Sequence, residues 1–239
     1  MWSGWDVLLV AGLGFLATVV LQLAVLLGAR LWFYPHADMA FVARQAIVLL
    51  VSQILVFLAI AAFMVMVIVS RYHMPFWSAI RWNWPRPEWK MLAVGAVMFV
   101  ALGFLESILP MPKDTPFEHL FDKPLDAYLI SILAVSVGPL IEELFFRGML
   151  YPVLARRFGM VWGVLLSALP FGLLHLPQYG WAWAAALVIF LVGVVCGAVR
   201  AVTDSVGASF LVHVGYNGTQ MLIALVATHG FQHLDKPKF

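Results

Sequence analysis

The chain has 239 residues, of which 64% are hydrophobic and only 11% are charged, and its mean hydropathy is +0.97. These values lie far outside the range of soluble globular domains. The formal net charge is only +2, and we expect no nucleic-acid partner. The composition is that of an integral membrane protein.

Seven apolar stretches are predicted to cross a bilayer as helices, since a spanning helix needs about 20 residues. The fifth of them is short, and either end could be re-entrant. All seven are much longer than the strands of a membrane barrel and do not alternate. The sequence therefore predicts an all-α fold, a polytopic transmembrane helical bundle of about seven to eight helices around a polar intramembrane cavity, and a single domain over 1–239. The predicted spans are 7–29, 46–70, 91–109, 127–154, 160–175, 181–199 and 206–228.

The connection 71–90 between the second and third spans interleaves four tryptophans with arginine and lysine. This composition is typical of a helix lying at the level of the lipid headgroups. Lys and Arg divide seven to six between the two sides of the membrane, with Lys236 and Lys238 among the six. This near-even count leaves the orientation of the chain open.

The fourth span carries three charged residues within six positions, Glu142, Glu143 and Arg147. A charge at the centre of a membrane helix costs roughly 2.5–3.5 kcal/mol, so such residues need partners. Glu143 and Arg147 are four positions apart and share a helix face, which predicts an ion pair. Glu142 is rotated by about 100° and is free to point elsewhere. The cluster is either a structural salt bridge near the membrane interface or part of a catalytic site.

Two later spans also carry polar side chains at helical spacing. Phe171 and His175 lie four apart at the end of the fifth span, and His213 and Asn217 lie four apart in the seventh. Polar residues in membrane helices normally face the bundle interior and one another. We therefore expect these residues to meet the acidic pair in one buried polar site.

This set of side chains suits the activation of water. Burial and a neighbouring carboxylate would tune Glu142 toward a general base, while Arg147 would hold Glu143 ionised. Histidine and asparagine can ligate a metal or donate hydrogen bonds to an oxyanion. The chain has no His-Glu-x-x-His or Gly-x-Ser-x-Gly motif, and its single cysteine, Cys196, excludes an intramolecular disulfide and a cysteine-rich metal site.

In this order, Glu142-Glu143-x-x-x-Arg147, Phe171-x-x-x-His175 and His213-x-x-x-Asn217 resemble the three motifs of the CAAX prenyl-protease and bacteriocin-processing family of intramembrane proteases. The resemblance covers the catalytic motifs over 138–217. It implies an endopeptidase that cuts near the carboxyl terminus of isoprenylated proteins, in a cavity open to the cytoplasmic leaflet. It also implies that Glu142 and His175 activate water, that His213 and Asn217 stabilise the oxyanion, and that Glu143, Arg147 and Phe171 support the site.

Several alternatives stay open. Glu142, His175 and His213 could hold zinc, but a mechanism without a cofactor is preferred because the Asn217 amide is a poor zinc ligand and a good oxyanion donor. The substrate is expected to be a peptide or protein, prenylated or membrane-associated, reached from the lipid bilayer of the inner or plasma membrane in a prokaryote. A non-catalytic scaffold, a bacteriocin-immunity-like protein and an ion-coupled transporter are the alternatives to a protease.

Overall fold

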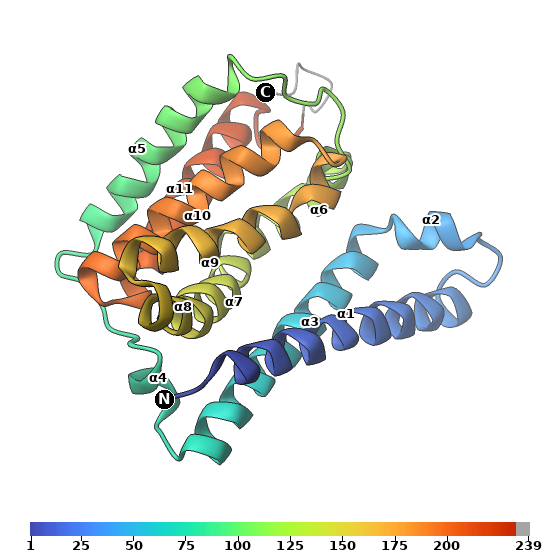
Figure 1. Ribbon diagram of the computed structural model, residues 1–239. Coiled ribbons are helices and arrows are strands. Elements are labelled where there is room, and N and C mark those ends of the chain that lie inside the picture. Colours follow the sequence, from blue (N-terminus) through green and yellow to red (C-terminus); the bar gives the residue numbers. More distant parts are fainter. Residues whose placement is uncertain (233–239) are drawn as a thin grey trace.

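The computed structural model describes residues 1–232, which contain helices and no strand. Six helical segments are long and apolar enough to cross a membrane, so the predicted polytopic helical bundle is confirmed. Figure 1 shows these helices running between two ends of the molecule. The six are α1 (Gly4–Trp32), α3 with its π-helical end η1 (Ala46–Val65 and Met66–Arg71), α5 (Trp89–Glu106), the run α6 to α8 (Pro124–Phe158), α10 (Trp183–Thr203) and α11 (Val206–Ala227).

The predicted fifth span is shorter than a full crossing. Helix α9 covers Met160–Leu174, and 15 helical residues reach only about 22 Å, whereas the hydrocarbon core is about 30 Å thick. A 3₁₀ turn, η4 (Leu176–Tyr179), follows it. His175 therefore lies at a helix end inside the bundle. The other short helices are α2 (Met39–Ala43), α4 (Phe76–Ala79) and the 3₁₀ turn η2 (Glu118–Phe121).

The predicted interfacial helix over 71–90 is wrong, because only α4 is helical there before α5 begins. Pro85 and Pro87 lack the N–H groups that a continuing helix would need. The segment instead stacks its aromatic rings, with Trp82 packed against Trp77, Trp84 and Phe210. It thereby holds the start of α11 in place.

The fourth crossing is interrupted at two positions. Helix α6 (Pro124–Val135) ends at a break on Ser136, and α7 (Val137–Glu143) begins directly after it. Pro139 explains the break, because a proline ring clashes with the carbonyl four residues earlier, here that of Val135. The π-helix η3 (Leu144–Leu150) then leads into α8 (Tyr151–Phe158).

The π-helical register of η3 leaves backbone carbonyls free. Tyr151 donates its N–H to Phe146 O, five residues back, and Pro152 has no N–H to give to Arg147 O. Arg200 Nε donates to Arg147 O at 3.2 Å instead. Trp2, which is 1% exposed, donates its indole N–H to Met149 O at 2.8 Å. The π-helix is thus held by side chains from α10 and from the amino terminus.

Helices α5 and α11 approach each other closely at two glycines. A Cβ on Gly95 would lie 2.1 Å from Val212 O, and a Cβ on Gly215 would lie 2.3 Å from Leu92 O. Small residues let membrane helices bring their backbones together in this way. This crossing fixes the position of α11, which carries His213 and Asn217.

Candidate active site

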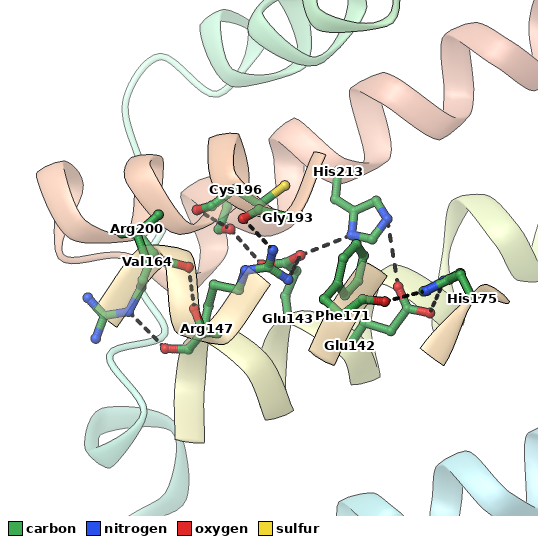
Figure 2. A network of polar contacts seen from close by, with 12 residues as sticks. Glu142, Glu143, Arg147, Val164, Phe171, His175, Gly193, Cys196, Arg200 and His213 are labelled. Carbon is green, nitrogen blue, oxygen red and sulfur yellow. Dashed lines mark hydrogen bonds and ion pairs between the residues drawn. The ribbon is translucent and has the colours of Figure 1, made fainter. Parts of the chain in front are cut away.

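The carboxylate of Glu142 lies between two histidine rings from different helices (Figure 2). His175 Nε2 is 3.8 Å from Glu142 Oε1, and His213 Nε2 is 3.7 Å from Glu142 Oε2. Glu142 extends from the end of α7, His175 caps α9, and His213 stands two turns into α11. The Glu142 side chain is 24% exposed, so the fold brings these three residues together at a site that solvent or a ligand can reach.

The second nitrogen of each ring shows which tautomer is present. His175 Nδ1 is 2.8 Å from the carbonyl oxygen of Phe171, which can only accept, so Nδ1 carries the proton. His213 Nδ1 is 3.0 Å from Glu143 Oε1 and likewise donates to an ionised carboxylate. In the neutral rings both Nε2 lone pairs therefore face Glu142.

Glu143 and Arg147 form the ion pair that their spacing predicts. Arg147 Nη1 donates to Glu143 Oε1 at 2.9 Å, and both side chains are fully buried. Arg147 Nη2 donates to Gly193 O at 2.7 Å, while Arg147 Nε has no partner among the described residues. Removal of one partner from such a buried ion pair strongly destabilises the folded protein, because the other charge is left buried without compensation.

Phe171 contacts both the histidine pair and the guanidinium. Its ring is 1% exposed and lies 4.9 Å from the ring of His175 and 5.8 Å from that of His213, centroid to centroid. The Arg147 guanidinium lies over the same ring at 4.7 Å, within cation–π range. Phe171 thus packs against three of the predicted site residues.

Asn217 has a different neighbour from the one expected. Its amide nitrogen Nδ2 donates to Ala134 O at 2.7 Å, two residues before the break at Ser136 in the fourth crossing. Asn217 lies one turn beyond His213 on α11. Within residues 1–232 its side chain makes no hydrogen bond to Glu142. One N–H of the Asn217 amide therefore donates to the backbone of α6, and the second N–H is left to donate another hydrogen bond.

Two contributors were missed by sequence reasoning. Ser209 Oγ lies 2.6 Å from Glu143 Oε2 and is fully buried, and its position four residues before His213 was the available signal. Tyr179, at the end of η4, lies close to the acidic groups. Burial, together with the negative charges of Glu106, Glu118 and Glu142, raises the pKa of Tyr179 to about 12, so its hydroxyl stays protonated.

The side chains of Glu142, His175 and His213 are of the types that bind zinc, but this trio is not among the groups of described residues whose ligand atoms all lie within 4.8 Å of one another. Two unprotonated Nε2 atoms and a carboxylate are the ligand types of catalytic zinc sites. Both Nδ1 atoms are held by a carbonyl or a carboxylate, the usual outer contacts of metal-binding histidines.

A second group, Glu143, Cys196 and His213, brings its ligand atoms within 4.8 Å of one another. It fits a cation poorly, because the Glu143 carboxylate is already bonded to Arg147 and Ser209. The Arg147 guanidinium would also repel a metal ion at that position.

The comparisons with known proteins agree with the motifs. Residues 124–219 match the family model described as type II CAAX prenyl endopeptidase Rce1-like. This segment contains all three motifs, and the family resemblance predicted from them is confirmed. No curated protein and no solved structure matches the chain.

Proposed function

Because residues 124–219 match the Rce1-like family model, we propose that the chain is a multi-pass intramembrane endopeptidase of the CAAX-protease type. The observation that carries the proposal is the Glu142 carboxylate facing the Nε2 atoms of His175 and His213 within a membrane bundle. Its substrate is a prenylated or membrane-associated protein that it cuts near the carboxyl terminus.

In this proposal Glu142 accepts a proton from the attacking water. His175 helps to activate the same water, because its Nδ1–H donates to Phe171 O and its Nε2 is free to accept a hydrogen bond from the water. The hydroxide attacks the scissile carbonyl carbon, and the proton then passes from Glu142 to the departing amine.

The oxyanion of the tetrahedral intermediate needs N–H donors. Asn217 has one amide N–H left after its bond to Ala134 O. His213 already donates Nδ1–H to Glu143, so it offers an Nε2–H only as the protonated imidazolium. We propose that His213 is neutral with a protonated Nδ1 in the resting site, and that it acts as the imidazolium after Nε2 takes up a proton from solvent, with Glu143 on one side and Glu142 on the other.

A metal-free mechanism is preferred here, although the same three side chains could hold zinc. A zinc ion at that site would supply Lewis acidity to the carbonyl and to water. In either case Glu142 is indispensable, and Phe171 and Glu143 orient the two histidines.

The first test is cleavage of a farnesylated CAAX peptide by the purified protein in lipid nanodiscs, with Glu142→Gln beside the wild type. Loss of a general base lowers turnover by about 100-fold or more. Glu88→Gln is the matched control, since Glu88 stands at the exposed start of α5, at one end of the molecule. Full activity of Glu142→Gln would refute the assignment, and absence of cleavage by the wild type would favour a non-catalytic scaffold or a non-prenylated substrate.

Two further arms of this assay separate the open alternatives. An unprenylated peptide of the same sequence tests whether the lipid is recognised. Treatment with a chelator tests the metal, because activity that is lost and then restored by zinc would overturn the metal-free mechanism.

A further inference from the structure

The Glu143 carboxylate receives three hydrogen bonds in the interior of the bundle. Oε1 accepts from Arg147 Nη1 at 2.9 Å and from His213 Nδ1 at 3.0 Å. Oε2 accepts from Ser209 Oγ at 2.6 Å. All four side chains are buried, with exposures between 0% and 5%.

Of these contacts, the one from Ser209 fixes how the carboxylate is turned. The terminal torsion of a glutamate has no narrow energy wells, so bonds to a single oxygen leave its rotation open. Arg147 does not clamp both oxygens, because its Nη2 is directed to Gly193 O. In the part of the chain that the structure describes, Ser209 makes the one hydrogen bond to Oε2.

The Ser209 hydroxyl is itself held in place. It also lies 2.8 Å from Cys196 O on α10, and the single hydroxyl proton is shared between the two acceptors. The bond to the carboxylate is the shorter and is charge-assisted, which favours donation to Glu143. Ser209 stands one turn before His213 on α11, so the same helix presents both partners of Glu143.

We propose that Ser209 is a positioning residue for His213. By holding Glu143 Oε2, Ser209 directs Oε1 to His213 Nδ1. The resting His213 ring is thereby kept in the tautomer that has a protonated Nδ1 and an unprotonated Nε2 facing Glu142. The inference rests on the proposed peptidase function for its kinetic consequence, but the tautomer of His213 can be measured whether or not the protein cuts a peptide.

The test compares Ser209→Ala with Ser52→Ala. Ser52 is a matched control because it is 3% exposed and, among residues 1–232, donates only to Leu49 O of its own helix. Nitrogen-15 NMR of histidine-labelled protein in nanodiscs reports the protonated nitrogen, and His213→Gln assigns the signal. We expect an Nδ1–H ring for His213 in the wild type and in Ser52→Ala, and a mixture of tautomers in Ser209→Ala.

Kinetics with the farnesylated peptide provides the second readout. Ser209→Ala is expected to lower kcat by about 10-fold or more with KM unchanged, the size of effect typical of residues that orient a working histidine. If the His213 signal of Ser209→Ala were the same as that of the wild type, the inference would be overturned, even if Glu142→Gln abolished cleavage. A wild type that does not cut the farnesylated peptide, while Ser209→Ala changes the tautomer, would count against a prenylated substrate or against peptidase activity and would leave the positioning role intact.

Discussion

Glu142 and Glu143 are adjacent in the chain but have opposite surroundings. Glu143 is completely buried and is compensated by Arg147, Ser209 and His213. Glu142 is 24% exposed, and the side chains facing it are the rings of His175 and His213. A rotation of about 100° between neighbouring helix positions produces this difference. The Glu143 carboxylate is therefore fully hydrogen-bonded inside the bundle, and the Glu142 carboxylate is the one available for the proposed proton transfer.

Asn217 provides a test at the level of one side chain. Asn217→Ala is expected to lower kcat by about 100-fold, because an oxyanion donor acts on the transition state and not on substrate binding. Steady-state kinetics with the farnesylated peptide measures this. Thr219→Val is the control, since Thr219 is two residues away and its hydroxyl donates, within the described part of the chain, only to Gly215 O of its own helix.

A different result would assign Asn217 another role. If Asn217→Ala raised KM alone, or lowered the unfolding temperature with kcat unchanged, the amide would serve only to hold the backbone of α6 through Ala134 O.

Part of this site could be predicted from residue spacing and part could not. The Glu143–Arg147 ion pair follows from a four-residue separation on a helix, which is local information. The partner of Asn217 could not be foreseen, because Ala134 O becomes available only where the helix breaks at Ser136. Ser209 was overlooked because a lone serine in an apolar helix normally bonds its own backbone.

At the level of elements, hydropathy located every long helix but not the irregular backbone within them. The π-helix η3 and the break before α7 depend on Pro152 and Pro139, whose presence signals an interruption without defining its geometry. The predicted helix over 71–90 failed for a related reason, since its tryptophans suited an interface while Pro85 and Pro87 prevented the helix.

The crossing of α5 and α11 gives a prediction for an element pair. Gly95→Ala would place a Cβ 2.1 Å from Val212 O and 2.6 Å from Tyr216 N, so the two helices must separate. Overpacking of this kind costs about 1–3 kcal/mol or more. Because α11 carries His213, peptidase activity is expected to fall as well. Thermal unfolding in detergent, followed by circular dichroism, measures the loss of stability.

Gly103 is the matched control on the same helix. A Cβ at Gly103 meets no atom within 4 Å, so Gly103→Ala should raise stability by about 0.5–1 kcal/mol through reduced backbone entropy of the unfolded chain. Equal unfolding temperatures for the two variants would contradict the close packing of α5 on α11.

At the scale of the whole molecule, charge is distributed unevenly between the two ends of the bundle. The end that holds the amino terminus and α4 (Figure 1) has seven Lys and Arg against three carboxylates, Asp6, Glu88 and Asp204. Within the described residues, the opposite end has four Lys and Arg against six carboxylates. Lys236 and Lys238, which are among the six basic residues predicted for this end, lie outside the described residues.

The basic end also carries the exposed tryptophans Trp77, Trp84 and Trp89, which suit a membrane–water interface. Asp6 and Asp204 are paired with Arg71 and Arg200, so Arg86, Lys90 and Arg157 dominate the charge that this end presents to lipid headgroups. Basic residues are retained on the cytoplasmic side of membranes. We therefore expect the amino-terminal end to face the cytoplasm.

Cysteine labelling in intact cells measures this orientation. Cys196 is fully buried, so the wild type should react little with a membrane-impermeant maleimide. Ser78→Cys, exposed on α4 at the basic end, should react only after lysis, whereas Ser107→Cys, exposed at the far end of α5, should react in intact cells. The reverse pattern would contradict the orientation.

Replacing Arg86, Lys90 and Arg157 together with glutamine should make Ser78→Cys partly reactive before lysis, because the orienting charge would then be removed.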